Sequence, residues 1–227
     1  MRVVRRFEFQ FDQQHARAVN ETLGHARRFR RGAAAAALLL GAATAGLVLN
    51  GHPWAYILAA VTALGGLTAL WLAVSAPGRA GTLEKLYERG ELVPAVVSEV
   101  RPRGAVLLAL VDVAKPDAPS ARYALVARKV RRLPGHEMKA GEHVPAVVEV
   151  TDQSARGPSV LWESVTAMPI AWATTDREVI QKARAAISDV EWRLLEDNMG
   201  LSAKVRRTRT KRILLDSDQL PDDLEHT

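Results

Sequence analysis

The stretch from Gly32 to Ala76 decides the fold: it reads GAAAAALLLGAATAGLVLN over residues 32–50 and WAYILAAVTALGGLTALWLAVSA over residues 54–76. Neither segment contains a charged residue, and only Gly51, His52 and Pro53 separate them. At about 1.5 Å of rise per helical residue, the segments extend roughly 25 Å and 35 Å, against a hydrocarbon core of about 30 Å. Backbone groups in lipid must bond within their own segment, so both runs are expected to be helices. The sequence predicts an antiparallel transmembrane hairpin over residues 32–76.

The residues around the two spans predict how the hairpin is oriented. Arginines cluster before the first span and basic residues follow the second, whereas the turn contains no Lys or Arg. By the positive-inside rule, we expect a two-span protein of the inner (cell) membrane with both termini in the cytoplasm. Three aromatic residues near the ends of the second span are expected to anchor it at the two interfaces: Trp54, Tyr56 and Trp71. A cleaved signal peptide is disfavoured, because the charged region before the first span is too long and a second span follows.

The composition outside the hairpin predicts one domain and anionic partners. Removing the hairpin and the N-terminal arm from the 227 residues leaves about 150, enough for one modest core. The chain has no cysteine, which excludes disulfides and thiolate metal sites. Its net charge is +6 and its pI about 10, so lipid head groups, phosphates or nucleic acid are candidate partners. The mean hydropathy of −0.04 hides this contrast between an apolar block and a charged remainder.

The arm of residues 1–31 has its own local pattern. Phe7, Phe9 and Phe11 alternate with polar residues, which indicates a half-buried strand. Asp12 can cap a following helix whose apolar residues recur at spacings of three and four, and this helix is expected to continue into the first span. An aromatic strand needs a partner, so we expect the arm to dock on the domain that follows the hairpin.

The domain after the hairpin contains an internal repeat. A linker and short helix over 77–90 lead into GELVPAVV at residues 90–97, which returns as GEHVPAVV at residues 141–148. Each copy is a turn glycine followed by a β-branched run. Further strand-like runs over 105–113, 123–130 and 159–166 predict a small SH3-like or OB-like β-barrel over residues 91–173. A gene duplication giving equivalent strands in two half-barrels and two similar strands of one barrel both remain open.

The C-terminal part is predicted to be helical and then strongly charged. Capping-box patterns at Thr175 and Ser188 predict two helices within an extension over 174–200, ending at Gly200. The segment 201–227 holds a basic run and an acidic tail. The fold class is therefore an α+β membrane protein: a helical hairpin, a small barrel and two C-terminal helices.

One family resemblance accompanies these patterns. The run from Leu86 to Val97 and the sequence Met168-Pro169-Ile170-Ala171-Trp172, preceded by a two-span hairpin, resemble uncharacterised actinobacterial two-span membrane proteins that carry a domain of unknown function. The resemblance implies a membrane location and carries over no functional residues.

A search for chemistry finds no catalytic motif. The Gly-x-Ser-x-Gly, Walker and dinucleotide glycine patterns are missing from the sequence, and the six histidines lack the i, i+4 spacing of a zinc protease. A metal site would have to use His136, Glu137 and His143, which lie around the second copy of the repeat. Their spacing disfavours such a site. We therefore expect no enzyme activity, no metal and no cofactor.

The basic residues are the candidate ligand contacts. Near a membrane, each is attracted to anionic lipid by about 1 kcal/mol, and the absence of an aromatic residue between Lys204 and Arg212 argues against nucleic acid. The candidate anionic-lipid contacts are Arg27, Arg28, Arg30, Arg31, Lys204, Arg206, Arg207, Arg209, Lys211 and Arg212. Neutralisation of the basic run by the acidic tail is the alternative. We expect a non-enzymatic inner-membrane protein whose domain binds a protein partner or a second copy, with a binder of anionic lipid or a phosphorylated envelope precursor as the alternative.

Overall fold

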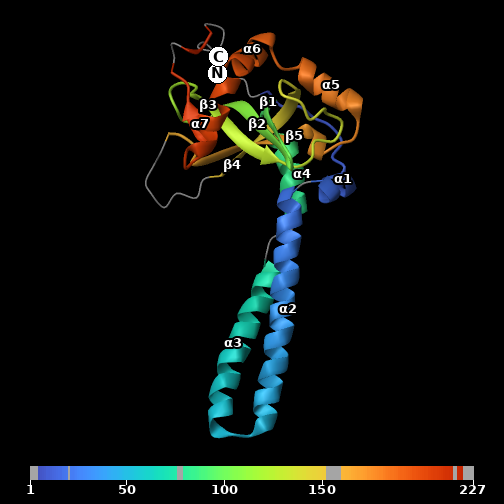
Figure 1. Cartoon of the computed structure of the whole chain (residues 1–227), viewed down its shortest axis with the longest axis vertical. Coiled ribbons are helices and arrows are strands. Elements are labelled where there is room, and N and C mark those ends of the chain that lie inside the picture. Colours follow the sequence, from blue (N-terminus) through green and yellow to red (C-terminus); the bar gives the residue numbers. More distant parts are fainter. Residues whose placement is uncertain (1–4, 20, 76–78, 152–159, 217–218, 222–227) are drawn as a thin grey trace. The chain divides into compact units, whose positions relative to one another are not determined.

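The computed structural model describes residues 5–19, 21–75, 79–151, 160–216 and 219–221 (Figure 1). The side chains of residues 17, 21–28 and 79–82 lie outside this description. The chain forms two compact units: Asn20–Gly81 is one, and Met1–Val19 together with Thr82–Thr227 is the other. Each unit is described by itself below.

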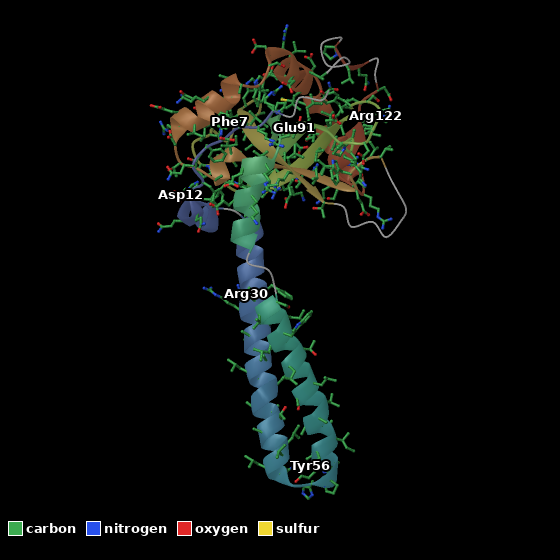
Figure 2. The ribbon with its side chains drawn as sticks, turned by 180° about the vertical axis from the view of Figure 1, so that it is seen from behind. Phe7, Asp12, Arg30, Tyr56, Glu91 and Arg122 are labelled. Carbon is green, nitrogen blue, oxygen red and sulfur yellow. The ribbon has the colours of Figure 1, made fainter. Side chains whose placement is uncertain are left out.

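The first unit is a helical hairpin of α2 (Glu21–Asn50) and α3 (Pro53–Ser75). The turn between them needs Gly51, whose φ of 71° is strained for residues with a side chain. Helix α2 begins well before the apolar run, so the charged residues from Glu21 to Arg31 belong to the same helix as the first predicted span. The predicted helical hairpin is confirmed, and Arg30 and Tyr56 lie toward its opposite ends (Figure 2).

The two helices of the hairpin pack through small residues and one pair of hydroxyls. A Cβ placed on Gly66 would lie 3.5 Å from Leu40 Cβ and 3.7 Å from the carbonyl oxygen of Ala37. The hydroxyls of Thr44 and Thr62 are hydrogen-bonded to each other across the interface at 2.8 Å. Small residues let the backbones approach, as is usual for helices in lipid. Close packing of the hairpin on itself therefore explains its central glycines.

Many large apolar side chains of the hairpin are exposed. Leu38 is 76% exposed and Leu49 86% exposed. Two segments are long and apolar enough to cross a membrane, Phe29–Asn50 and Pro53–Ser75, and 0% and 17% of their most apolar windows are buried. A core helix of a soluble domain would bury this surface, so its exposure favours lipid contact.

The second unit is built on an antiparallel six-stranded sheet with the order β5-β4-β1-β2-β3-β6. Its strands are β1 (Leu92–Arg101), β2 (Gly104–Asp112), β3 (Tyr123–Val130), β4 (His143–Thr151), β5 (Ser164–Pro169) and β6 (Arg212–Leu214). The predicted strand over 159–166 is displaced, because β5 begins at Ser164; Ser159 lies outside the described residues. The predicted β domain is thus present as an antiparallel sheet, and the strand β6, which begins at Arg212 at the end of the basic run, was not predicted.

The sheet curls into a half-barrel. Arg128 of β3 reaches β5 at the far end of the strand order, where its Nη1 donates to Thr166 Oγ1 at 3.2 Å and to the Ala167 carbonyl at 3.3 Å. An isolated bridge joins Ala114, beyond β2, to Leu161, before β5. The inner face contains small apolar residues that allow this tight curvature: Val93, Ala95, Ala109, Val111, Val113, Ala124, Val126, Ala146, Val148, Val165 and Ala167.

The two copies of the repeat are neighbouring strands of this one sheet. Strands β1 and β4 pair antiparallel, with Pro94 opposite Pro145. Val97 N donates to Glu142 O and Val148 N to Glu91 O, both at 3.0 Å, so the copies are related by a local two-fold. Alternation along the ladder makes Pro94 and Pro145 a non-hydrogen-bonded pair, where neither missing N–H is needed. The two copies are therefore adjacent strands of one curled sheet.

The N-terminal arm docks on this domain, as predicted. Leu92 N donates to the Arg5 carbonyl at 2.8 Å, and Arg5 Nη2 forms an ion pair with Glu191 at 2.8 Å. The rings of Phe9 and Phe11 lie 6.0 Å and 5.7 Å from the ring of Tyr87. The predicted strand is wrong over these phenylalanines: the backbone forms one bridge, Arg6 to Glu91, because aromatic packing rather than a ladder holds the segment.

The first two helices around the domain confirm two local predictions. Asp12 caps α1 (Gln13–Val19) by accepting from His15 N at 2.9 Å. Helix α4 (Arg79–Arg89) buries Leu83 and Tyr87, and the Tyr87 hydroxyl donates to the Pro169 carbonyl at 2.9 Å. The residues 77–78 of the predicted linker lie outside the described residues.

The C-terminal helices cover the outer face of the sheet, since the inner cluster contains no helical residue. They are α5 (Arg177–Ala185), α6 (Asp189–Asp197) and α7 (Ser202–Arg207), with short 3₁₀ turns η1 (Ile170–Trp172) and η2 (Met199–Leu201). The capping box at Ser188 is confirmed, whereas Asp176 rather than Thr175 caps α5. Gly200 does not end the helical region, because η2 leads directly into α7.

Candidate ligand pocket and basic segment

A polar pocket lies beside the second copy of the repeat. Its cavity volume is about 610 Å³, within the range of small-molecule sites. The loop before β4 forms one wall and helix α5 the other. The lining residues are Gly135, His136, Glu137, Lys139, Glu142, Arg177, Ile180, Gln181 and Arg184.

Local structure explains why these side chains meet. Gly135 and Gly141 have φ values of 76° and 86°, which turn the loop before β4 back on itself. On α5, Arg177, Ile180 and Arg184 recur at spacings of three and four and share one side of the helix. The Asp176 carboxylate fixes the start of this helix by accepting from Glu178 N at 2.8 Å. Both walls of the pocket are therefore set by backbone geometry.

The loop wall contains two paired carboxylates. Lys139 Nζ lies 2.7 Å from Glu137 Oε2, and this hydrogen bond lowers the pKa of Glu137 and raises the pKa of Lys139. Glu142 Oε1 lies 3.1 Å from Nδ1 of His136, whose side chain is only 4% exposed. A carboxylate can only accept, so Nδ1 of His136 is the donor. The buried Nε2 of the same ring has no hydrogen-bond partner among the described residues.

The helix wall contains two arginines with spare donors. Arg177 is exposed and has no ion pair among the described residues. Arg184 Nη2 donates to Nδ1 of His143 at 2.9 Å, a neutral acceptor that leaves the guanidinium charge uncompensated. The pocket thus combines two arginines facing a loop whose own acids are already paired.

His143 holds Arg184 in place. Because a guanidinium can only donate, His143 Nδ1 accepts, and the ring carries its proton on Nε2, which donates to Glu196 Oε1 at 2.5 Å. The imidazole is also stacked on Trp192, with ring centroids 4.2 Å apart and planes at 7°. Helix α6 therefore positions an arginine of α5 through one histidine of β4.

His143, which bonds to a lining residue of the pocket, occupies the single position where the two repeat copies differ. Leu92 in the first copy is 1% exposed and belongs to the core, whereas its counterpart His143 contacts Arg184. Glu142, equivalent to Glu91, turns toward His136. One substitution within a repeated motif thus converts a core position into part of a polar site.

The structure gives the two histidines near the second copy different carboxylate partners. The structure places His136 with Glu142 and His143 with Glu196, and no group of three or more His, Asp or Glu residues able to hold a metal occurs in the described part of the chain. The sequence search missed Arg177 and Arg184. Their seven-residue spacing on a capped helix was the available signal, but only the fold shows that this face meets the loop before β4.

The predicted basic run is folded into the domain. Val205 of α7 is fully buried, Arg206 lies 3.6 Å from Glu99, and Arg212 Nη1 donates to the Trp162 carbonyl at 2.5 Å. The other four cations of the run are exposed, and the described residues give them no ion-pair partner: Lys204, Arg207, Arg209 and Lys211. Asp218 and the acidic residues from 222 onward lie outside the described residues.

The remaining predicted contacts lie in the hairpin unit. Trp54, Tyr56 and Trp71 are 54%, 52% and 67% exposed, as required for interfacial anchors. Arg30 and Arg31 are exposed, and Arg30 Nε also donates to the Ala73 carbonyl at 3.0 Å. The side chains of Arg27 and Arg28 lie outside the described residues.

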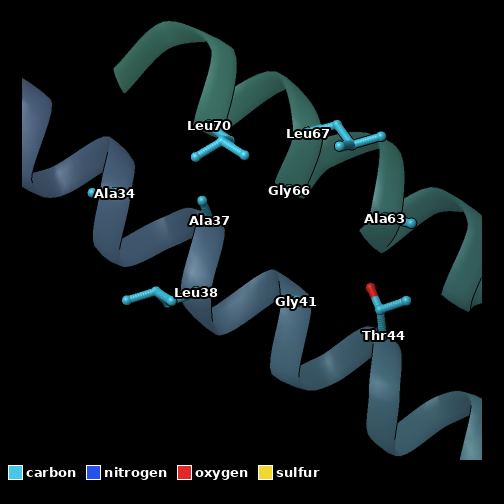
Figure 3. Close-up of a pocket in the computed structure, with 9 residues that line it drawn as sticks. All are labelled: Ala34, Ala37, Leu38, Gly41, Thr44, Ala63, Gly66, Leu67 and Leu70. Atoms are coloured by element: carbon cyan, nitrogen blue, oxygen red, sulfur yellow. The ribbon is translucent and has the colours of Figure 1, made fainter. Parts of the chain in front are cut away.

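An apolar groove of about 610 Å³ also runs between α2 and α3. Leu70 and Ala37 point toward one another across it, and Thr44 lies at one end (Figure 3). The lining of small residues and leucines suits contact with acyl chains or a further apolar helix.

These features define a class: a two-helix apolar hairpin joined to an antiparallel half-barrel with C-terminal helices. Residues 78–202 match the model of the family described as "Protein of unknown function (DUF3239)", and the chain belongs to this family. The matched residues contain the repeat and the polar pocket. The resemblance to actinobacterial membrane proteins with a domain of unknown function is confirmed.

One solved structure is similar, described as "Crystal structure of a putative membrane protein from Corynebacterium diphtheriae". It is 39% identical, covers 55% of this chain and 100% of that chain, and has a TM-score of 0.50. A comparison with curated proteins gives no match. These findings agree with a membrane protein of unknown function.

Proposed function

We propose that this chain is a non-enzymatic inner-membrane protein whose cytoplasmic half-barrel domain binds another protein, such as a subunit of a larger membrane assembly. The observation that carries the proposal is the outward exposure of the hairpin leucines, which suits an anchor in lipid. The arginine-rich flanks of the hairpin and its uncharged turn support an orientation with both termini in the cytoplasm. The sequence contains no catalytic motif, and we therefore propose binding as the role of the anchored domain.

The proposal also extends to the shape of the domain. The Ala114–Leu161 bridge and the reach of Arg128 to β5 support a small SH3-like or OB-like barrel, a fold whose open end and strand edges commonly bind partners. On this domain, Val160 and Leu214 are apolar side chains that are 60% and 40% exposed. They provide positions for a crosslinker outside the core.

Photo-crosslinking in intact cells tests the protein-partner proposal. A photoreactive residue at Val160 or Leu214 of the full-length chain should yield a discrete adduct with a second protein or a second copy. The matched control places the same residue at Leu39, which is 73% exposed on the hairpin and is expected to face lipid. Adducts at neither domain position would contradict the proposal. A reporter fused after Thr227 that is active outside the cell would contradict the orientation.

A second candidate function is binding of anionic lipid or a phosphorylated envelope precursor by the basic segment, defined as Lys204–Arg212. Four exposed cations without ion-pair partners among the described residues favour it. Attraction of about 1 kcal/mol per charge near an anionic surface would draw the segment to lipid.

Chemical modification of arginines in the basic segment tests this second candidate. The full chain is placed in nanodiscs and treated with a guanidine-modifying reagent. Anionic lipid should protect Arg207 and Arg209 from modification, and this protection should decrease at high salt. Arg193, exposed on α6, is the control side chain. Equal modification in anionic and neutral nanodiscs would remove the candidate.

A further inference from the structure

We propose that the pocket between the loop before β4 and helix α5 binds a small organic phosphate. This site is separate from the basic segment and does not depend on a protein partner. The side chains that line the cavity support this ligand, and so does one buried atom that has no partner among the described residues.

The cationic groups of the pocket match a phosphate. Arg177 and Arg184 are two turns apart on α5, so their Cα atoms are separated by about 10 Å along the axis. Arginine side chains can reach a shared ligand from that distance, and their planar donor forks fit phosphate oxygens. Arg177 has no carboxylate partner among the described residues, and Arg184 bonds only to an uncharged imidazole there.

His136 provides an independent observation. Its ring lines the cavity, its side chain is 4% exposed, and its Nε2 is buried without a hydrogen-bond partner. Buried polar atoms are nearly always bonded, so an orphan atom at a cavity indicates a missing partner. Nε2 has almost no accessible surface, so a phosphate oxygen would bond to it only after a small rotation of the ring toward the cavity.

The acids in the lining do not oppose this ligand. Glu137 is bonded to Lys139 at 2.7 Å and Glu142 to His136 at 3.1 Å, so both carboxylates already have cationic or N–H partners. Their remaining oxygen lone pairs can accept from hydroxyl groups. The cavity volume of about 610 Å³ leaves room for an organic body beyond the phosphate.

The probe is glycerol 3-phosphate, which has both a phosphate monoester and hydroxyl groups. The full-length chain in detergent is titrated by calorimetry, with glycerol and acetate at equal ionic strength as comparison solutes. A parallel arm measures binding to nanodiscs that contain phosphatidic acid, against phosphatidylcholine alone. Binding of the soluble probe assigns the ligand to solution, whereas binding restricted to phosphatidic acid assigns it to a lipid head group.

Two variants and two controls decide the site. Arg177→Gln and Arg184→Gln should each weaken binding about tenfold, the effect of losing a charge-assisted contact. Lys182→Gln removes a charge from an exposed position of the same helix outside the pocket lining, and Arg207→Gln removes one from the basic segment. Both controls should bind glycerol 3-phosphate as the wild type does, and all four variants should keep the unfolding temperature of the ligand-free protein.

The proposal is overturned by either of two results. One is that neither glycerol 3-phosphate nor phosphatidic acid binds in preference to its comparison. The other is that Lys182→Gln or Arg207→Gln weakens binding of glycerol 3-phosphate as much as the pocket variants do. That result would indicate diffuse attraction to a basic surface. A failed protein-partner experiment would leave these measurements unchanged, so the two proposals are tested separately.

Discussion

Leu92 and His143 occupy equivalent positions in the two paired copies of one motif, yet Leu92 is in the core and His143 is bonded to Arg184 and Glu196. Leucine is thus compatible with the backbone that both positions share. The two copies therefore differ in the contacts of this side chain: Leu92 packs in the core, and His143 bonds to polar side chains.

His143→Leu is predicted to keep the fold and weaken the pocket. The variant makes the two copies identical. The free energy of unfolding of the domain should therefore lie within about 1.5 kcal/mol of the wild-type value, the usual range for a tolerated exchange. Arg184 loses its acceptor, and affinity for glycerol 3-phosphate should fall severalfold. Calorimetry and thermal unfolding measure the two effects, and unchanged affinity would show that His143 does not position Arg184.

The glycines of the two copies should differ in their tolerance of alanine. A Cβ on Gly90 would lie 2.1 Å from Val147 Cγ1 and 2.6 Å from the Leu86 carbonyl oxygen, whereas Gly141 has open space but a φ of 86°. Gly141→Ala should cost about 1 to 2 kcal/mol of unfolding free energy. Gly90→Ala should cost more, about 3 kcal/mol or above, because backbone as well as side chain must shift. Denaturant unfolding of both variants would refute this order if Gly141→Ala were the less stable.

Tyr87→Phe is predicted to destabilise the domain by about 1 to 2 kcal/mol. The variant removes the hydroxyl that donates to the Pro169 carbonyl and leaves that buried oxygen without its partner. Burial raises the pKa of Tyr87, so the wild-type hydroxyl stays protonated where tyrosines of the unfolded chain ionise. Tyr56→Phe, at an exposed position of the hairpin, is the control and should leave the unfolding of the domain unchanged.

Stability should respond to acid partly through Glu99. The hydrogen bond from Arg101 lowers the pKa of Glu99, and burial raises it to a lesser degree. The carboxylate therefore stabilises the fold above the ordinary pKa of 4.5, and this contribution is lost as the pH falls through the lower folded-state pKa. Because the carboxylate is partly exposed and screened by solvent, the effect is expected to remain below about 1 kcal/mol.

Glu99→Gln provides the measurement for that acid response. At neutral pH the variant should be slightly less stable than the wild type, and the difference should close toward pH 3 or below. A constant difference across the titration would assign the effect to packing instead of charge.

Much of the fold could be predicted from local patterns, and the failures have a common cause. The uncharged runs at 32–50 and 54–76 specified the hairpin because length and charge alone decide whether a helix can span lipid. The strand expected at Phe7–Phe11 was wrong because alternation cannot distinguish ladder pairing from ring packing. The basic run was expected outside the core, but Val205 within it is fully buried, and a single apolar residue among cations gives little signal.

The pocket could be anticipated only in pieces. His136 and His143 were recognised as polar residues near the second copy, and their sequence spacing said nothing of Arg177 and Arg184 some forty residues later. That juxtaposition depends on α5 packing against β4, a tertiary contact that sequence periodicity does not encode.

The opposed prolines at the local two-fold have a consequence for assembly. A strand that pairs with a near-copy of itself is self-complementary. The β1 strands of two molecules could therefore form with each other the same antiparallel ladder that β1 forms with β4 within one chain. Within one chain β4 is favoured, because the connection through β2 and β3 keeps it at a high effective concentration near β1. Mutations that loosen β4 would therefore be expected to convert this intramolecular pairing into an exchange of strands between molecules confined to the same membrane plane.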